Sequence, residues 1–269
     1  KRGRTVRRPD YSVMNERGLQ GAATKPAKSK PLKPRISDPT SVTEALMRFD
    51  GPKWRGSMKK ELLNLLKTGT IEWVPITHLP KGRRALTGKW VFKIKYLPDG
   101  TVEKYRARWT ARGFTQVKGL DYEKTYAPTP RAATARVLLA LCAQHGWKRR
   151  QIDVETAFMN PDLDKEIYIK PPEGSDLFVK NSNKMLVKVK RGLYGMKQAA
   201  HLWYYDAAET LEKLGLRRTA SDQFLFQGNG IIVLLHVDDF QICAKNKKKI
   251  DRLIAGLKKK YSIKTVDTN

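Results

Sequence analysis

Apolar residues recur at two spacings along the chain, and these spacings separate helical from extended segments. Between Pro52 and Lys67 they repeat every three or four residues up to Gly69, which predicts an amphipathic helix. From residue 70 to about 115 apolar and polar residues alternate, which predicts strands, with Pro98-Asp99-Gly100 as a hairpin turn. The same patterns predict further helices after Ser41 and at 132–144, 198–214 and 248–261, and further strands at 151–155, 166–170, 224–226 and 231–244.

The N-terminal part differs from the rest in composition. It is dense in Lys, Arg, Pro, Gly and Ser and has almost no apolar periodicity, which predicts a basic disordered linker over residues 1–38. Lys1-Arg2-Gly3-Arg4 has the composition of a nuclear-localisation or phosphate-binding patch, although a solvated linker explains the same charge.

Charge narrows the class of partner. The net charge is +28 over 269 residues, which favours salt-sensitive binding to a polyanion such as nucleic acid. No stretch approaches the apolar length of a membrane-spanning helix, so no membrane partner is expected. Cys142 and Cys243 lack paired spacing, and the His residues form no metal-spaced pair. These features exclude a disulfide framework and a zinc site, and predict two buried thiols.

Carboxylates follow two of the predicted strands. The apolar run 231–235 leads through His236 and Val237 into Asp238 and Asp239, and Asp153 stands on the separate segment 151–155. Adjacent carboxylates beside an apolar sheet repel each other, and a divalent cation removes that penalty. Three Asp on two strands are typical of a two-metal phosphoryl-transfer site, which with the basic charge indicates a nucleic-acid polymerase.

A cationic face is predicted on the strand at 104–109. Lys104, Arg106 and Arg108 lie two residues apart, so they point to the same side. A solvated edge strand and a phosphate-binding surface both explain this face, and the pattern alone does not separate them.

Longer motifs connect these features to a known family. They are QIDVETAFMN at 151–160, LYGMKQ at 193–198 and HVDD at 236–239, preceded by KWVFK at 89–93, YRAR at 105–108 and GFTQ at 113–116. In this order they closely resemble the reverse transcriptases of copia-type LTR retrotransposons, over about residues 50 to 245. Each motif alone is moderately specific, whereas their shared order makes coincidence very improbable.

The resemblance implies a right-hand polymerase of the α+β class. N-terminal helices and fingers would occupy 39–150. Residues 151–269 would form a palm with an interleaved fingers segment, built as an antiparallel sheet with packed helices. The thumb would be absent or truncated. The implied activity is two-metal nucleotidyl transfer by an RNA-directed DNA polymerase, with two Mg²⁺ ions or Mn²⁺ in their place. The implied metal ligands are Asp153, Asp238 and Asp239, with the backbone carbonyl of Val154 beside the second ion.

The resemblance also implies residues that contact the incoming dNTP. Phe158 falls where the family places a bulky ring that excludes a ribose 2′-hydroxyl, although a core Phe is the alternative. Gly195 and Lys197 fall where the second motif contacts nucleotide and template. Candidates for binding the triphosphate are Lys93, Lys95, Arg106 and Arg108.

Three departures from the family pattern leave a second function open. His236 stands where the family usually has Tyr, Ala199-Ala200-His201 replaces Ala-Pro-Arg, and Asn160-Pro161-Asp162 replaces Asn-Gly-Asp. None is an implied metal ligand. The alternative is a retrotransposon-derived remnant that binds nucleic acid without polymerase activity. An unrelated basic structural protein, such as a ribosomal component, would not need three Asp at strand ends.

The implied partners are an RNA or DNA template-primer, dNTP and the rest of a Pol polyprotein, with integrase upstream and a thumb and RNase H downstream. The implied location is a cytoplasmic virus-like particle, and the basic N-terminus leaves a nuclear location open. Because the chain ends at Asn269, we expect either a piece of a longer polyprotein or a truncated gene, which could be inactive alone.

Overall fold

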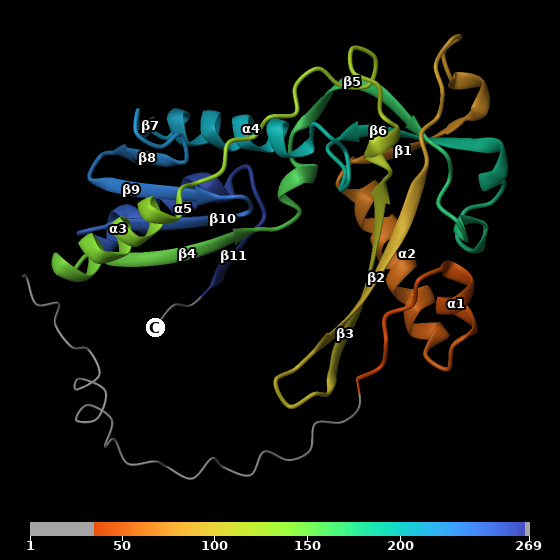
Figure 1. Cartoon of the computed structure of the whole chain (residues 1–269), viewed down its shortest axis with the longest axis horizontal. Helices are drawn as coiled ribbons and strands as arrows, with labels where there is room; N and C mark the ends of the chain where they lie inside the picture. The colour runs from red at the N-terminus through yellow and green to blue at the C-terminus, as the bar shows by residue number, and fades with distance from the viewer. Residues whose placement is uncertain (1–34, 267–269) are drawn as a thin grey trace, which may run out of the picture.

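The computed structural model describes residues 35–266, and Figure 1 shows how their helices and strands are arranged. Most of the linker predicted at 1–38 lies outside the described residues. Within them, no helix is long and apolar enough to cross a membrane. The α-helices are α1 (Val42–Met47), α2 (Gly51–Lys67), α3 (Ala132–Gln144), α4 (Ala199–Lys213) and α5 (Lys247–Lys258). The strands are β1 (Ile71–Pro75), β2 (Gly88–Tyr96), β3 (Val102–Ala111), β4 (Lys148–Val154), β5 (Asp162–Ile169), β6 (Met185–Arg191), β7 (Arg217–Arg218), β8 (Leu225–Gly228), β9 (Ile231–His236), β10 (Asp239–Ala244) and β11 (Ile263–Val266).

Six antiparallel strands form the largest sheet, in the order β11-β4-β10-β9-β8-β7. On one face, Trp203 of α4 meets Phe240 of β10 edge-on, with ring centroids 6.4 Å apart. On the other face, Cys142 of α3 lies beside Cys243 of β10. Both cysteines are buried and free, which confirms the sequence prediction. Helices on both faces of this sheet bury its central strands and make one apolar core.

A second core is built around shorter sheets. The three-stranded sheet β1-β6-β5 and the two-stranded ribbon β2–β3 pack with α1 and α2. Trp54 of α2 meets Phe92 and Tyr105 of the ribbon edge-on, at centroid distances of 5.2 and 4.8 Å. Figure 1 shows the ribbon extending away from the six-stranded sheet, beside α1 and α2. Phe158 packs against both cores and therefore lies at their junction.

Side chains close the open edges of the ribbon. The Ser57 hydroxyl of α2 accepts a 2.8 Å hydrogen bond from the Ala107 N–H and donates a 3.1 Å bond to the Tyr105 carbonyl. On the other edge, Asp38 accepts a 2.7 Å bond from the Ile94 N–H. Because a two-stranded ribbon alone is only marginally stable, these bonds stand in for neighbouring strands.

The elements agree well with the sequence pattern. Helix α3 has the predicted bounds, and α2 ends where Gly69 takes a φ of 68°. Gly100 has a φ of 83° in the predicted hairpin turn between β2 and β3. Strands β6, β7 and β11 are additional to the prediction. Strand β11 is short and gains its hydrogen bonds only by pairing with β4, a long-range contact that local periodicity does not indicate.

Candidate active site

Three aspartates meet at one end of the six-stranded sheet, which we call the carboxylate corner (Asp153, Asp238 and Asp239). Asp239, the first residue of β10, lies directly opposite Asp153 of β4 in the strand register. The Val154 N–H donates to the Asp238 carbonyl at 2.9 Å. Residues paired directly across strands project from the same face of a sheet, so Asp153 and Asp239 share a face. The strand register and the turn thus place the three residues next to one another, while their role in metal binding stays a prediction.

The turn between β9 and β10 holds Asp238 in place despite an unfavourable backbone conformation. Val237 has a φ of 55°, in the left-handed region that β-branched residues rarely adopt. Its carbonyl accepts a 2.6 Å hydrogen bond from the indole N–H of Trp203, which is only 2% exposed. The turn is therefore supported from the core, and such support gives a functional group a fixed position.

Burial and repulsion between carboxylates act together on Asp153. Burial, and then the charges of Asp238 and Asp239, raise the pKa of Asp153 above its usual value. Lys264, which pairs with Asp153 in the β11–β4 register, opposes that rise, and its ammonium forms an ion pair with Glu155. A bound cation would relieve the remaining repulsion.

The donor set of the corner fits Mg²⁺ in its chemistry, because the ion prefers hard carboxylate oxygens. Across residues 35–266, no group of three or more His, Cys, Asp or Glu side chains is already arranged to hold a metal ion. Mg²⁺ usually takes few protein carboxylates and completes its shell with water and substrate oxygens. Asp153, Asp238 and Asp239 are therefore suited to a site that is completed when substrate binds.

Phe158 lies close to the corner, on the 3₁₀ turn η4 (Ala157–Met159) that follows β4. Its ring meets the Tyr194 ring edge-on, with centroids 5.7 Å apart and an interplanar angle of 83°. The Arg108 guanidinium of β3 lies 4.6 Å from the centroid of the Tyr194 ring. The three side chains therefore form a continuous series of contacts from the ribbon to η4.

Tyr194 is a residue that the sequence analysis missed, although it stands inside the LYGMKQ motif. Burial raises the pKa of its phenol, Arg108 and Arg106 oppose that rise, and Glu61 and Asp238 add to it. These influences put Tyr194 between the cations of the ribbon and the carboxylate corner. The sequence signal that could have identified Tyr194 was the motif itself, in which Tyr194 directly precedes Gly195.

Gly195 and Lys197, which belong to the same motif as Tyr194, contact the end of β3 and the segment that follows it. Gly195 has a φ of 85°, and a Cβ there would lie 2.2 Å from the Ala111 carbonyl oxygen, so only glycine fits. The Lys197 ammonium donates to the Gln116 carbonyl at 3.2 Å and to the Tyr122 hydroxyl at 3.3 Å. These contacts already engage Lys197, and its contact with nucleotide or template stays a prediction.

The ribbon carries a cationic face. Its register pairs Lys93 with Arg106 and Lys95 with Lys104, while Phe92 and Ala107 lie buried on the opposite face. The predicted alternation is thus confirmed. The residues of the cationic face are Lys93, Lys95, Lys104, Arg106 and Arg108. Lys93 already pairs with Asp38 at 2.7 Å, so a phosphate there would compete with a carboxylate.

Comparison with known proteins decides the family. A sequence model of the family described as reverse transcriptase (RNA-dependent DNA polymerase) matches residues 72–268. The chain belongs to this reverse transcriptase family. It is 35% identical over 232 residues to the retrovirus-related Pol polyprotein from transposon TNT 1-94 of Nicotiana tabacum, covering 84% of this chain and 17% of the relative. The Pol polyprotein from transposon RE1 of Arabidopsis thaliana is 30% identical over 233 residues, covering 85% and 15%.

A more distant relative is the transposon Ty1-ER2 Gag-Pol polyprotein of Saccharomyces cerevisiae, 26% identical over 283 residues that cover 97% of this chain and 15% of the relative. These relatives confirm the resemblance to copia-type retrotransposons, and the chain is the reverse transcriptase region of such a Pol polyprotein. The chain spans 15% to 17% of the length of these relatives.

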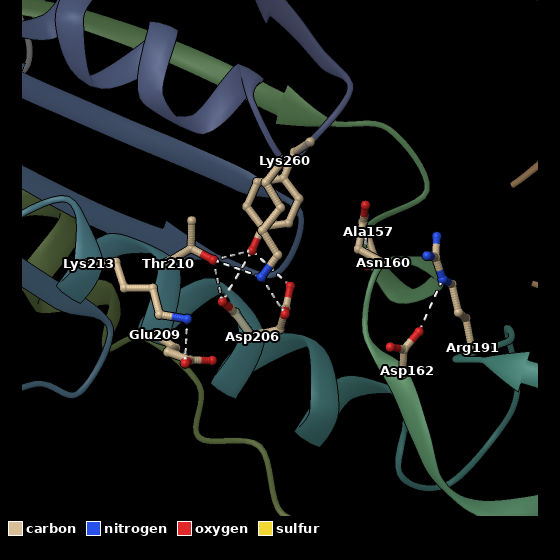
Figure 2. A network of polar contacts seen from close by, with 10 residues as sticks. Ala157, Asn160, Asp162, Arg191, Asp206, Glu209, Thr210, Lys213 and Lys260 are labelled. Carbon is tan, nitrogen blue, oxygen red and sulfur yellow. Dashed lines mark hydrogen bonds and ion pairs between the residues drawn. The ribbon is translucent and has the colours of Figure 1, made fainter. Parts of the chain in front are cut away.

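The structure describes the surroundings of the positions at which this reverse transcriptase departs from the family pattern. The carbonyl of Pro161 accepts a 3.1 Å hydrogen bond from the Gly192 N–H, and Asn160 precedes it. The Asn160 amide donates to the carbonyls of Thr156 and Ala157 at 3.3 and 3.1 Å, which closes the turn that carries Phe158. Figure 2 shows this amide beside Ala157. His201 Nδ1 lies 2.6 Å from the carbonyl oxygen of Tyr126. His236 is exposed and lies opposite Asp239 in the β9–β10 register.

A polar cluster fixes the segment that leads into β11 of the reverse transcriptase (Figure 2). Asp206 of α4 accepts hydrogen bonds from Lys260 at 2.6 Å and from the Tyr261 hydroxyl at 2.8 Å. Lys260 also donates to Thr210 at 3.0 Å. Because β11 begins two residues after Tyr261, this cluster also helps to position Lys264 beside Asp153. The sequence analysis missed the cluster, since no local spacing connects α4 with residues 260–261.

Proposed function

We propose that this reverse transcriptase chain provides the fingers and palm of an RNA-directed DNA polymerase that copies an RNA or DNA template into DNA. The observation that carries the proposal is the placement of Asp153 opposite Asp239, with Asp238 in the adjoining turn. In this assignment the six-stranded sheet is the palm. The ribbon and the three-stranded sheet belong to the fingers.

Asp153, Asp238 and Asp239, with the Val154 carbonyl, would hold two Mg²⁺ ions, or Mn²⁺ in their place. When bound, such ions lower the pKa of the primer 3′-hydroxyl and neutralise charge on the α-phosphate and the leaving pyrophosphate. The hydrogen bond from Trp203 to the Val237 carbonyl would keep the turn, and with it Asp238, in a fixed position, so that little rearrangement is needed when substrate binds.

The other residues bind and orient the substrates. The cationic face of the ribbon would bind the triphosphate and the template backbone as phosphate-positioning contacts. The candidates for the triphosphate are Lys93, Lys95, Arg106 and Arg108. The Phe158 ring would exclude a ribose 2′-hydroxyl by steric overlap. Gly195 and Lys197 would position the nucleotide and template from the second motif.

The context of the chain is part of the proposal. Because the relatives are Pol polyproteins of which the chain spans a small part, integrase upstream and thumb and RNase H downstream are the expected neighbours. Template-primer and dNTP are the expected ligands. The expected location is a cytoplasmic virus-like particle, and a nuclear location stays open.

Primer extension in Mg²⁺ tests this function. We expect extension with dNTP that is lost in Asp153→Asn and kept in Asp164→Asn, which neutralises an exposed Asp of β5. Template-primer binding without any extension by the unmodified protein would instead support the nucleic-acid-binding remnant. Absence of both binding and extension would contradict both functions.

A further inference from the structure

Tyr194 occupies a position between the two cores that the proposed mechanism does not use. Its backbone is fixed, because its carbonyl accepts a 2.8 Å hydrogen bond from the Ala111 N–H at the end of β3. The next residue, Gly195, fits against Ala111 only without a side chain, and a Cβ on Gly113 would lie 2.0 Å from the Gly195 carbonyl oxygen. The Tyr194 ring therefore starts from a rigid part of the backbone.

The ring of Tyr194 has a different neighbour on each side. Phe158 approaches it edge-on at 5.7 Å, and the Arg108 guanidinium lies 4.6 Å from its centroid. Edge-to-face pairing of rings and a cation over a ring face are both favourable geometries. The ring thus joins a cation of the ribbon to the residue that the proposed function places under the nucleotide sugar.

Phe158 needs support from outside its own turn. It stands on the one-turn 3₁₀ segment η4, and Thr156 just before it has a φ of 53°, in the left-handed region. The Phe158 ring is only partly buried, so part of it is free of protein contacts. A steric filter works only if its ring cannot move aside, and contact with the Tyr194 ring limits such movement.

We propose that Tyr194 is a positioning residue for sugar discrimination: held by Arg108, its ring fixes Phe158 against the site of the incoming nucleotide. The inference rests on the proposed polymerase function and deepens it. It assigns the role to the ring and not to the hydroxyl, because both contacts involve the ring. Truncating Tyr194 lets Phe158 rotate away, so a ribonucleotide enters more readily while the carboxylate corner is unchanged.

The test compares kcat/KM for dNTP and rNTP in primer extension by the whole protein. Tyr194→Leu is expected to lower the dNTP/rNTP ratio by about tenfold, a change of about 1.4 kcal/mol in discrimination, chiefly through a rise in rNTP use. Tyr194→Phe keeps the ring and is expected to keep the ratio. A matched control is Tyr168→Leu, which removes another tyrosine with a cation near its ring, Lys188 at 5.7 Å, on the β5–β6 pair.

A double-mutant cycle separates positioning from general packing. If Tyr194 acts through Phe158, then adding Tyr194→Leu to Phe158→Val produces no further loss of discrimination. Additive losses, or equal effects of Tyr194→Leu on dNTP and rNTP, would overturn the inference. The same holds if Tyr194→Phe behaves like Tyr194→Leu.

Calorimetric binding of dATP and ATP gives a readout that needs no turnover. The affinity ratio of the two nucleotides is expected to narrow in Tyr194→Leu and to remain in Tyr194→Phe. If the unmodified protein binds both nucleotides with the same affinity, the inference fails. A protein that discriminates in binding but never extends a primer would contradict the proposed function while leaving the role of Tyr194 supported.

Discussion

The carboxylate corner and the β2–β3 ribbon are stabilised in different ways. Behind the corner lie fully buried residues of adjacent strands, among them Ile152, Leu235 and Phe240. The ribbon buries one face and leaves the cationic face in solvent, and its outer edges are closed by single side chains such as Ser57 and Asp38. The strands of the corner are paired on both sides within the six-stranded sheet, whereas the ribbon is a two-stranded sheet that packs one face into the second core.

The packing of the six-stranded sheet explains why the corner can hold two unfavourable features. A left-handed Val237 and the mutual repulsion of the aspartates both cost free energy, and a well-packed sheet can tolerate that cost. A ribbon with an exposed face has less stability to lose.

The largest expected effect is a separation of activity from stability at the corner. Asp153→Asn removes a carboxylate that is repelled by Asp238 and Asp239, so extension should fall to background while stability in EDTA stays equal or rises. Thermal unfolding and primer extension on the same samples check this. A clear loss of stability would mean that Asp153 supports the fold, and it would contradict the view that repulsion in the corner costs stability.

The next effect concerns the buried support of the turn. Trp203→Ala should cost about 3 to 5 kcal/mol in the free energy of unfolding, since it empties a fully packed site. Trp203→Phe keeps a ring but removes the donor to the Val237 carbonyl, at a cost of about 1 kcal/mol. If the turn depends on this bond, Trp203→Phe lowers extension more than its small stability loss explains. Chemical denaturation and extension assays measure both.

Asp222 gives a prediction about how the stability of the protein depends on pH. It accepts hydrogen bonds from the Thr134 hydroxyl at 2.6 Å and from the Arg131 N–H at 3.2 Å, which joins the start of α3 to the loop before β8. Burial would raise the pKa of Asp222, but hydrogen bonds from Thr134, Phe224 and Arg131 lower it below its usual value. Asp222→Ala should therefore cost about 1 to 3 kcal/mol at neutral pH.

The sign of the pH effect follows from that lowered pKa. The contribution of Asp222 is present above the unfolded pKa of about 4 and is lost as pH falls through the still lower folded value. The stability difference between the unmodified protein and Asp222→Ala should shrink in acid. Asp251→Ala, at an exposed position of α5, is the control and should show little difference at any pH.

The sequence predicted those parts of the fold and site that depend on local pattern. The apolar run before Asp238 indicated a buried strand, and the alternation of Arg106 and Arg108 indicated their shared face; both are found in the structure. The motif order indicated that Asp153 and Asp239 belong together, but only the strand register places them opposite each other. Local pattern therefore predicted which residues to compare and not how they meet.

The parts that the sequence did not predict depend on contacts between distant segments. The proposed role of Tyr194 depends on its contacts with Arg108 and Phe158, which belong to other elements. Asp206 meets Lys260 and Tyr261 only after α4 and the segment following α5 pack together. No periodicity in one segment carries such information, because it arises from tertiary packing.

The smallest expected effect lies on the ribbon and completes the comparison. Asp38→Asn removes the ion pair with Lys93 while an amide oxygen remains for the Ile94 N–H. Both side chains are partly exposed, so stability should change by less than about 0.5 kcal/mol. The freed Lys93 should then bind a phosphate, which steepens the salt dependence of template-primer affinity by up to about one in log–log slope.

Glu72→Gln changes the net charge equally but frees Lys190 on β6, away from the ribbon. Fluorescence anisotropy titrations at several salt concentrations compare the two variants. Equal slopes in both would show that only net charge matters, and the ribbon would then have no particular role in nucleic-acid binding.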